Sequence, residues 1–173
     1  MNTLFLRNLN VYKKIKCLVK NSDVKQRLAE KGVLNTVFAP VGIDLDLVNK
    51  DFEQYDKNEL KEKYGFKSED KIILFIGRLE EEKRPVELIE YFEELKKIDE
   101  NYRLLIVGKG CLYEQMQAAI KEKNLSESIV YIEKIPNNEI WELYRISESF
   151  VNLNKQEIFG MVLLEAMFYK TKI

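Results

Sequence analysis

Four short apolar runs constrain the fold of this chain more than any other feature. From Lys71 onward, each run is rich in β-branched residues, ends at a glycine or a polar turn, and is followed by a stretch with helical periodicity. The runs cover residues 72–76, 104–107, 129–132 and 150–153. Strands that alternate with helices in this way imply right-handed crossovers and a parallel sheet covered on both faces. We therefore predict an α/β domain with a doubly wound parallel sheet.

The stretches between the runs predict amphipathic helices. The first helix is expected to begin at Pro85, because proline suits the first helical position. The third follows Pro136 with Asn137 or Asn138 as its cap, and the last covers residues 161–169. The predicted inward residues are Val86, Ile89, Phe92 and Leu95 in the first helix, Leu112, Met116, Ala119 and Ile120 in the second, and Ile140, Leu143 and Tyr144 in the third.

The N-terminal part has a similar pattern on a smaller scale. Residues 15–19 and 36–39 predict strands, and residues 23–31 predict a helix that ends at Gly32. The segment from Asp44 to Lys71 is polar, with one short helical stretch at 57–64, and suits a crossing between domains better than a core element. We therefore divide the chain into 1–42, a connection at 43–70, and a main domain at 71–173.

Composition excludes several classes of function. The 173 residues contain no histidine, so imidazole bases, Ser-His or Cys-His pairs and histidine-containing zinc sites are excluded. Two cysteines cannot form a disulfide framework, and we expect Cys17 to be a buried thiol in a reduced compartment. A net charge of -1 with interspersed signs argues against nucleic-acid binding. The longest apolar stretches hold about half a dozen residues, well short of the roughly 18 needed to span a membrane.

The residues that follow the apolar runs suggest an anion site. Ligands of open parallel sheets gather beyond the carboxyl ends of the strands, so Gly77-Arg78, Gly108-Lys109-Gly110 and the turn at Ile135-Pro136 should share one edge. Lys83 and the helix N-terminus at Gly160 should lie there too. Such cations and glycines suit a phosphate group. The sequence has neither a Walker loop nor a dinucleotide fingerprint, which disfavours a dehydrogenase domain.

Two glutamates complete the candidate site. Glu157 precedes the last predicted helix. If this helix starts near Gly160, Glu165 lies about 7.5 Å along its axis, which suits contacts of the two glutamates to different parts of one elongated ligand. Glu165 has apolar neighbours and therefore needs a partner, either a ligand or a nearby lysine. Taken singly, Arg78 and Lys83 are more readily interpreted as surface charges, Glu157 as a solvated loop residue, and Lys109 as either; only their combination favours a ligand site. Four aromatic residues lie within amphipathic patterns and are therefore interpreted as packing residues rather than as rings that stack on a sugar: Tyr12, Tyr91, Trp141 and Tyr144.

In their order and spacing, these pieces resemble the donor-binding half of family 4 retaining glycosyltransferases with the GT-B fold. The matching pieces are Val41-Gly42-Ile43-Asp44, Gly77-Arg78-Leu79 with Lys83, Val107-Gly108-Lys109-Gly110, and Glu157 through Glu165 with Ala166-Met167. The resemblance runs from about Ile15 to the end of the chain and implies a Rossmann-like C-terminal lobe, with residues 1–42 as the remnant of a second, acceptor-side lobe.

The resemblance also implies roles for individual residues. Arg78 and Lys83 would bind the diphosphate of a nucleotide sugar, and these two residues with Glu157 form the expected catalytic set. Glu165 would hold the ribose hydroxyls and Glu157 the donor sugar. The remaining donor-binding residues would be Gly77, Gly108, Lys109, Phe159, Gly160 and Met161. No metal or other cofactor is implied, because the cations and a helix N-terminus would stabilise the leaving diphosphate.

The sequence departs from the family pattern at two places. Leu153-Asn154 stand where the family usually has Pro-Ser, and the chain ends at Ile173 before a further turn, strand and helices. We therefore expect a fragment truncated at both ends, whose uncovered surfaces promote self-association.

The resemblance predicts hexosyl transfer with retention to a saccharide or lipid-linked acceptor, in polysaccharide or glycolipid synthesis. The expected location is cytoplasmic, either free or peripheral to the inner face of the membrane. The alternative is a nucleotide-sugar-binding module without turnover of its own.

Overall fold

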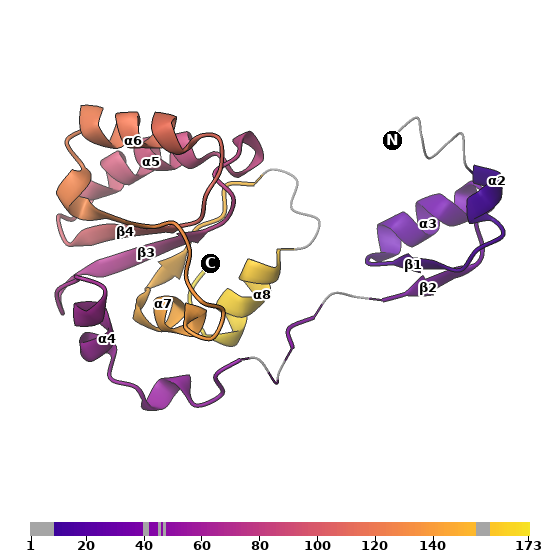
Figure 1. The fold of residues 1–173 in the computed structure, drawn as a ribbon, viewed down its shortest axis with the longest axis horizontal. Helices are drawn as coiled ribbons and strands as arrows, with labels where there is room; N and C mark the ends of the chain where they lie inside the picture. Colours follow the sequence, from indigo (N-terminus) through magenta and orange to yellow (C-terminus); the bar gives the residue numbers. More distant parts are fainter. Residues whose placement is uncertain (1–8, 40–41, 45, 47, 155–159) are drawn as a thin grey trace. The chain divides into compact units, whose positions relative to one another are not determined.

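The computed structural model describes residues 9–39, 42–44, 46, 48–154 and 160–173. The chain divides into two compact units, Met1–Gly42 and Ile43–Ile173, which we describe separately (Figure 1).

The first unit is a small βαβ structure. It contains α2 (Leu9–Tyr12), β1 (Cys17–Val19), α3 (Ser22–Glu30) and β2 (Thr36–Phe38), and β1 pairs with β2 in parallel. The Asn21 side chain accepts a hydrogen bond from the Val24 amide at 2.8 Å and so caps α3. The two strands and the helix confirm the sequence pattern, with shorter strands than predicted.

The second unit is built on a parallel sheet of four strands in the order β5-β4-β3-β6. The strands are β3 (Lys71–Ile76), β4 (Tyr102–Val107), β5 (Ile129–Ile132) and β6 (Ser149–Phe150). The chain runs outward from β3 to β5 and then returns to place β6 on the other side of β3, so the predicted doubly wound sheet is confirmed. The fourth strand is shorter than predicted, because only Ser149 and Phe150 pair with β3.

Helices cover both faces of this sheet (Figure 1). One face carries α5 (Pro85–Ile98) and α6 (Tyr113–Glu122), and the other carries α4 (Lys57–Lys63), α7 (Ile140–Ile146) and α8 (Met161–Phe168). Short 3₁₀ turns lie at Phe52–Gln54, Glu81–Lys83 and Ser126–Ser128. As predicted, α5 begins at Pro85.

The alternation of β3 explains why its sequence is continuously apolar. Ile73 and Phe75 pack in the core beneath α5 and α6, while Ile72 and Leu74 pack in the second core with α7. Because successive side chains of a strand point to opposite faces, a sheet that is covered on both sides needs apolar residues at every position.

The segment 43–70 corrects the sequence interpretation. Its polar composition suggested a crossing without core residues, but Phe52, Leu60 and Phe66 are buried in the core that contains α7. The segment also pairs with α7 through Glu142, whose Oε2 accepts hydrogen bonds from Lys63 Nζ and Tyr64 Oη, each at 2.6 Å. Three widely spaced apolar residues were therefore enough to anchor an otherwise charged segment.

Smaller predictions also needed correction. Residue Glu139 precedes α7 as its cap and makes no side-chain capping bond, so the proposed asparagine cap is wrong. Tyr91 is 52% exposed and does not pack in the core, and Cys17 is only partly buried. Trp141 and Tyr144 are buried as predicted. In the described part of the chain, no helix is long and apolar enough to cross a membrane.

Candidate functional site

The loops after β3 and β4 hold each other in place at the carboxyl edge of the sheet. The Gly77 amide donates to the Val107 carbonyl at 3.0 Å, and the Leu79 amide donates to the Lys109 carbonyl at 3.0 Å. The Gly108 amide donates to the Ile132 carbonyl at 3.0 Å, which ties the same loop to β5. The backbone pairing of the three strands therefore continues into the loops that carry the predicted site residues.

Glycine is required in the β4 loop because the two backbones almost touch. Gly108 has φ +141°, and a Cβ atom at this position would lie 1.9 Å from the Gly77 carbonyl oxygen. A Cβ atom on Gly110 would lie 2.3 Å from the Leu79 carbonyl oxygen. The sequence pattern suggested that these glycines serve a phosphate ligand, whereas the structure shows that they allow the protein's own loops to approach closely.

A hollow of about 240 Å³ lies beyond the ends of β3, β4 and β5. Four of the predicted site residues line it together, namely Gly77, Arg78, Gly108 and Lys109. Two charged residues that the sequence did not single out, Glu133 and Lys134, also line this hollow, and they follow directly on the third apolar run. The hollow thus brings two glycines together with three cationic residues, Arg78, Lys109 and Lys134, and one acidic residue, Glu133.

The predicted diphosphate ligands Arg78 and Lys83 differ in their surroundings. The Arg78 side chain is 70% exposed and forms an ion pair with Glu82, four residues further along the chain. Lys83 is half-buried in the 3₁₀ turn, and its aliphatic chain runs past Gly77. An anion that binds Arg78 would therefore have to compete with Glu82.

A second hollow of about 200 Å³ adjoins the first, because Ile140 lines both. The predicted residues Met161 and Glu165 of α8 lie in its wall, together with Asp44 and Asn137. Gly160 immediately precedes α8 as its cap residue. The α8 N-terminus, the Glu165 side chain and the edge of the first hollow are thus neighbours.

Glu165 has the partner that its apolar surroundings require. Its Oε2 accepts a hydrogen bond from the Tyr144 hydroxyl at 2.8 Å. Burial raises the pKa of Glu165, and the bond from Tyr144 acts in the opposite direction. Tyr144 was interpreted only as a packing residue, because nothing in its amphipathic pattern marks a hydroxyl that reaches another helix.

Two of the predicted site residues, Glu157 and Phe159, lie outside the described residues. Their expected contacts with the donor sugar therefore stay predictions.

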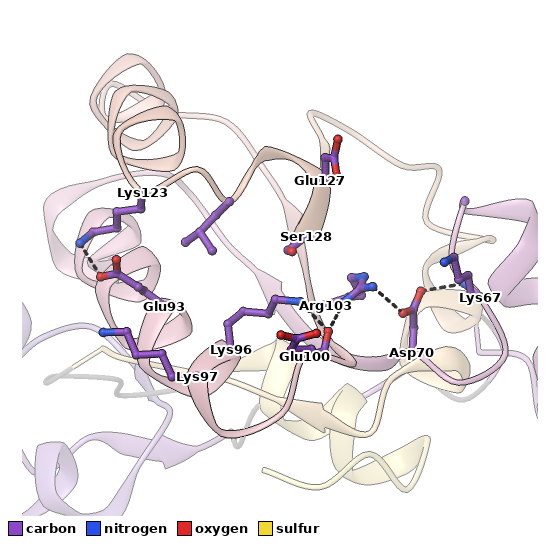
Figure 2. A pocket seen from close by; sticks show the side chains of 12 residues that line it. Lys67, Asp70, Glu93, Lys96, Lys97, Glu100, Arg103, Lys123, Glu127 and Ser128 are labelled. Atoms are coloured by element: carbon purple, nitrogen blue, oxygen red, sulfur yellow. Dashed lines mark hydrogen bonds and ion pairs between the residues drawn. The ribbon is translucent and has the colours of Figure 1, made fainter.

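A larger hollow of about 730 Å³ lies at the opposite, amino edge of the sheet (Figure 2). Figure 2 shows that some of its charged side chains pair with one another, Lys123 with Glu93 and Arg103 with Asp70. Lys123 Nζ lies 2.7 Å from Glu93 Oε2, and Arg103 lies 3.2 Å from the buried Asp70. These pairs leave little unbalanced charge for an anionic ligand, which favours the carboxyl edge as the candidate site.

Among the residues that the structure describes, no three or more Cys, Asp and Glu side chains come together in a way that could hold a metal ion.

Comparison with known proteins identifies the family. Residues 56–173 match the family model for glycosyl transferases group 1. The chain belongs to this family. Among curated proteins, it is 29% identical over 112 residues to N-acetyl-alpha-D-glucosaminyl L-malate synthase of Bacillus anthracis, covering 65% of this chain and 29% of that protein. It is 27% identical over 146 residues to alpha-monoglucosyldiacylglycerol synthase of Acholeplasma laidlawii, covering 84% of this chain and 36% of the relative.

Solved structures confirm the fold of this group 1 glycosyltransferase chain. A glycosyltransferase from Rickettsia africae ESF-5 superposes with a TM-score of 0.77 at 24% identity, covering 99% of this chain and 47% of that chain. Staphylococcus aureus TarM, in a complex that contains UDP, superposes with a TM-score of 0.72 at 21% identity, covering 96% and 30%. The α/β architecture with its parallel sheet is thus that of GT-B glycosyltransferases. The chain spans 29% to 36% of the length of the two curated relatives.

Proposed function

We propose that this chain is the donor-binding part of a hexosyltransferase, which transfers a sugar from a nucleotide-diphosphate sugar with retention of configuration. The observation that carries the proposal is the hollow beyond β3, β4 and β5, where two glycines lie with three cationic residues and only one acidic residue, Glu133, beside the hollow that Glu165 lines. Such a site suits a diphosphate joined to a polyhydroxylated group, because cations bind phosphate oxygens and a carboxylate accepts hydrogen bonds from hydroxyls.

The proposed reaction places positive charge where negative charge develops. The bond between the anomeric carbon and the diphosphate oxygen breaks, and an acceptor oxygen forms a bond to the same face of that carbon. The acceptor proton passes to the departing phosphate oxygen. Arg78 and Lys83 stabilise the charge on the diphosphate, so this part of the chain would need neither a metal nor another cofactor.

The two glutamates would bind the remainder of the donor. Glu165 accepts hydrogen bonds from the ribose hydroxyls, and Glu157 contacts the sugar that is transferred. Backbone amides at Phe159, Gly160 and Met161 contribute further donors near the start of α8.

We also propose roles for the two units and the acceptor. Residues 1–42 belong to an acceptor-side lobe, 43–70 connect the lobes, and 71–173 bind the donor. The names of the two curated relatives, a glucosaminyl malate synthase and a glucosyldiacylglycerol synthase, support a hexosyl donor and a small or lipid-linked acceptor. The protein would act in surface polysaccharide or glycolipid assembly at the cytoplasmic side, either free or peripheral to the membrane.

A second candidate is a nucleotide-sugar-binding module without turnover of its own. It is favoured by the position of the described site residues, which all lie in the unit Ile43–Ile173. Sugar transfer by the isolated chain to any acceptor would refute it, whereas binding with no transfer would support it.

Calorimetric titration tests the donor site. We expect at least one of the UDP, GDP and ADP sugars or their diphosphates to bind, and Glu165→Ala to weaken binding about tenfold or more, since a hydrogen bond to a charged group is worth roughly 1.5 to 3 kcal/mol. Glu122→Ala is the matched control, because Glu122 is an exposed glutamate of α6. Failure of every nucleotide to bind, or equal affinity of the two variants, would overturn the proposal.

The diphosphate contact has its own test. Arg78→Ala should weaken binding and reduce its dependence on salt, because one phosphate contact is lost. Arg27→Ala is the matched control, since Arg27 is an exposed arginine that pairs with Asp23 four residues away, as Arg78 does with Glu82. Equal salt dependence in both variants would remove Arg78 from the proposed site.

Self-association is a further expectation. Several large apolar side chains are exposed, including Leu18 at 73%, Leu34 at 78% and Met167 at 64%. Light scattering should therefore report oligomers at high concentration. A monomer throughout the concentration series would contradict this expectation.

A further inference from the structure

Tyr144 and Glu165 form a contact between two helices that lies at the wall of the second hollow. Tyr144 is on α7 and Glu165 is on α8. The Tyr144 hydroxyl is 2.8 Å from Glu165 Oε2 and 3.2 Å from the Val162 carbonyl oxygen. A hydroxyl has one proton to donate, and the shorter contact to a charged acceptor is the stronger one. The Tyr144 hydroxyl therefore donates its hydrogen bond chiefly to the Glu165 carboxylate.

The Tyr144 ring is held in place by contacts other than the one with Glu165. The side chain is 1% exposed and stacks on Tyr169 with ring centroids 5.4 Å apart. The Tyr144 carbonyl oxygen accepts a hydrogen bond from the Thr171 hydroxyl at 3.0 Å, which holds the backbone of the same residue. The hydroxyl is thus a rigid donor, because neither the ring nor its backbone has room to move.

The contact leaves one carboxylate oxygen of Glu165 able to accept hydrogen bonds from a ligand. Oε2 is bound by Tyr144, and within the described part of the chain Oε1 accepts no hydrogen bond. Glu165 lines the 200 Å³ hollow, beside Asn137 and Met161. A carboxylate that is anchored through one oxygen presents the other in a single direction, which lowers the entropy lost on ligand binding.

We infer that Tyr144 is a positioning residue, which anchors Glu165 so that the second carboxylate oxygen faces vicinal hydroxyls of the bound nucleotide. This inference rests on the proposed function, since it assigns those hydroxyls to the ribose. Tyr144 itself does not touch the ligand. Its effect on binding passes through Glu165 alone.

The same contact gives the site a characteristic pH dependence. The titratable groups beside Glu165 are Tyr144 from α7, Tyr169, which directly follows α8, and Asp44, which lines the same hollow. The hydrogen bond from Tyr144 lowers the pKa of Glu165 against the effect of burial, so its removal raises that pKa. Protonation turns Glu165 into a weaker acceptor. Loss of nucleotide affinity on acidification should therefore begin at a higher pH without the Tyr144 hydroxyl.

Tyr144→Phe tests the inference, because it removes the hydroxyl and keeps the ring that packs in the core. The probes are uridine, guanosine and adenosine diphosphates and the 2′-deoxy form of whichever binds. In the wild-type chain, loss of the 2′-hydroxyl should weaken binding about tenfold, the size expected for a hydrogen bond to a charged group. In Tyr144→Phe, the ribonucleotide should bind about tenfold more weakly, and the 2′-hydroxyl should matter less than about threefold.

Tyr64→Phe is the matched control, because the Tyr64 hydroxyl also donates to a glutamate, Glu142, at 2.6 Å. It should lose stability and keep both the preference for the 2′-hydroxyl and the wild-type pH profile. A merely structural role of Tyr144 would leave the preference and the profile of Tyr144→Phe unchanged as well, and that result would overturn the inference.

Glu165→Ala separates the inference from the proposed function. If Glu165→Ala weakens binding while Tyr144→Phe keeps the full preference for the 2′-hydroxyl, the inference fails and the proposed function stands. If no diphosphate binds, or if Glu165→Ala binds like the wild type, both fail together. Loss of the preference in both variants, with the control unchanged, supports both.

Discussion

The crowded backbone between the β3 and β4 loops predicts a graded response to alanine at four glycines. Gly108 combines φ +141° with a Cβ position 1.9 Å from a carbonyl oxygen, whereas Gly110 has the close approach alone, at 2.3 Å. Gly65 has φ +80° with no atom within 4 Å of a Cβ, and a Cβ on Gly77 would meet only ordinary contacts, the nearest at 3.5 Å. The four sites thus separate backbone strain from steric overlap.

The expected costs follow from these geometries. Gly77→Ala should change the free energy of unfolding by less than about 0.5 kcal/mol, as for substitutions without a specific clash. Gly65→Ala should cost about 1 to 2 kcal/mol, the usual penalty of a left-handed conformation for an L-residue. Gly110→Ala should cost about 2 to 3 kcal/mol, because backbone must move to relieve the overlap. Gly108→Ala adds both effects and should cost about 3 to 5 kcal/mol.

Urea unfolding followed by tryptophan fluorescence measures these costs. The chain has a single tryptophan, Trp141, which is 7% exposed in a core of the second unit, so the signal reports on this unit alone. The ratio of the four costs is more informative than any one of them. Equal stability of Gly108→Ala and Gly77→Ala would refute the argument that the two loops leave no room for a side chain.

Three further predictions concern charged groups. Tyr64→Phe should lower the free energy of unfolding by about 1 to 2 kcal/mol in the same urea assay, because the partly buried carboxylate of Glu142 loses a donor; an unchanged midpoint would contradict this. Glu82→Gln should tighten diphosphate binding by about 1.4- to 5-fold in calorimetry, since an exposed ion pair that competes for Arg78 is worth about 0.2 to 1 kcal/mol, and weaker binding would argue against competition. Burial raises the pKa of Glu165, so the carboxyl group of this residue binds a proton more tightly in the folded chain than in the unfolded chain. At neutral pH, where the carboxyl group is ionised, its burial therefore opposes folding. Glu165→Gln should therefore stabilise the chain at pH 7, and the gain should vanish as the pH falls to the ordinary glutamate range; a gain that is independent of pH would show a different cause.

The predicted fold depended on features that are local in sequence. The parallel sheet and the start of α5 were predicted from the apolar runs at β3, β4 and β5 and from Pro85. A strand that is buried on both faces and the first residue of a helix each have a short, recognisable sequence pattern. The residue at which β6 ends could not be predicted from such a local pattern. Residues 150–153 are apolar or neutral, yet only Ser149 and Phe150 pair with β3, since pairing depends on where the neighbouring strand lies.

The candidate site was predicted in part. Gly77, Arg78, Gly108 and Lys109 meet at one hollow, as the rule for parallel sheets implies. Lys134 and Glu82 were missed, because single charges in loops have no periodicity that distinguishes them from solvated residues. The positions of a ligand and of Glu157 stay predictions.

The sequence alone determined the class of fold and the edge of the sheet at which chemistry is expected, because both follow from the order of strands and helices. Only the tertiary structure decided why Gly108 must be glycine and which hydroxyl meets Glu165. Gly77 and Gly108 are 31 residues apart in sequence, and Tyr144 and Glu165 are 21 residues apart. Contacts over such separations arise when whole elements pack, so no local pattern of residue types could have specified them.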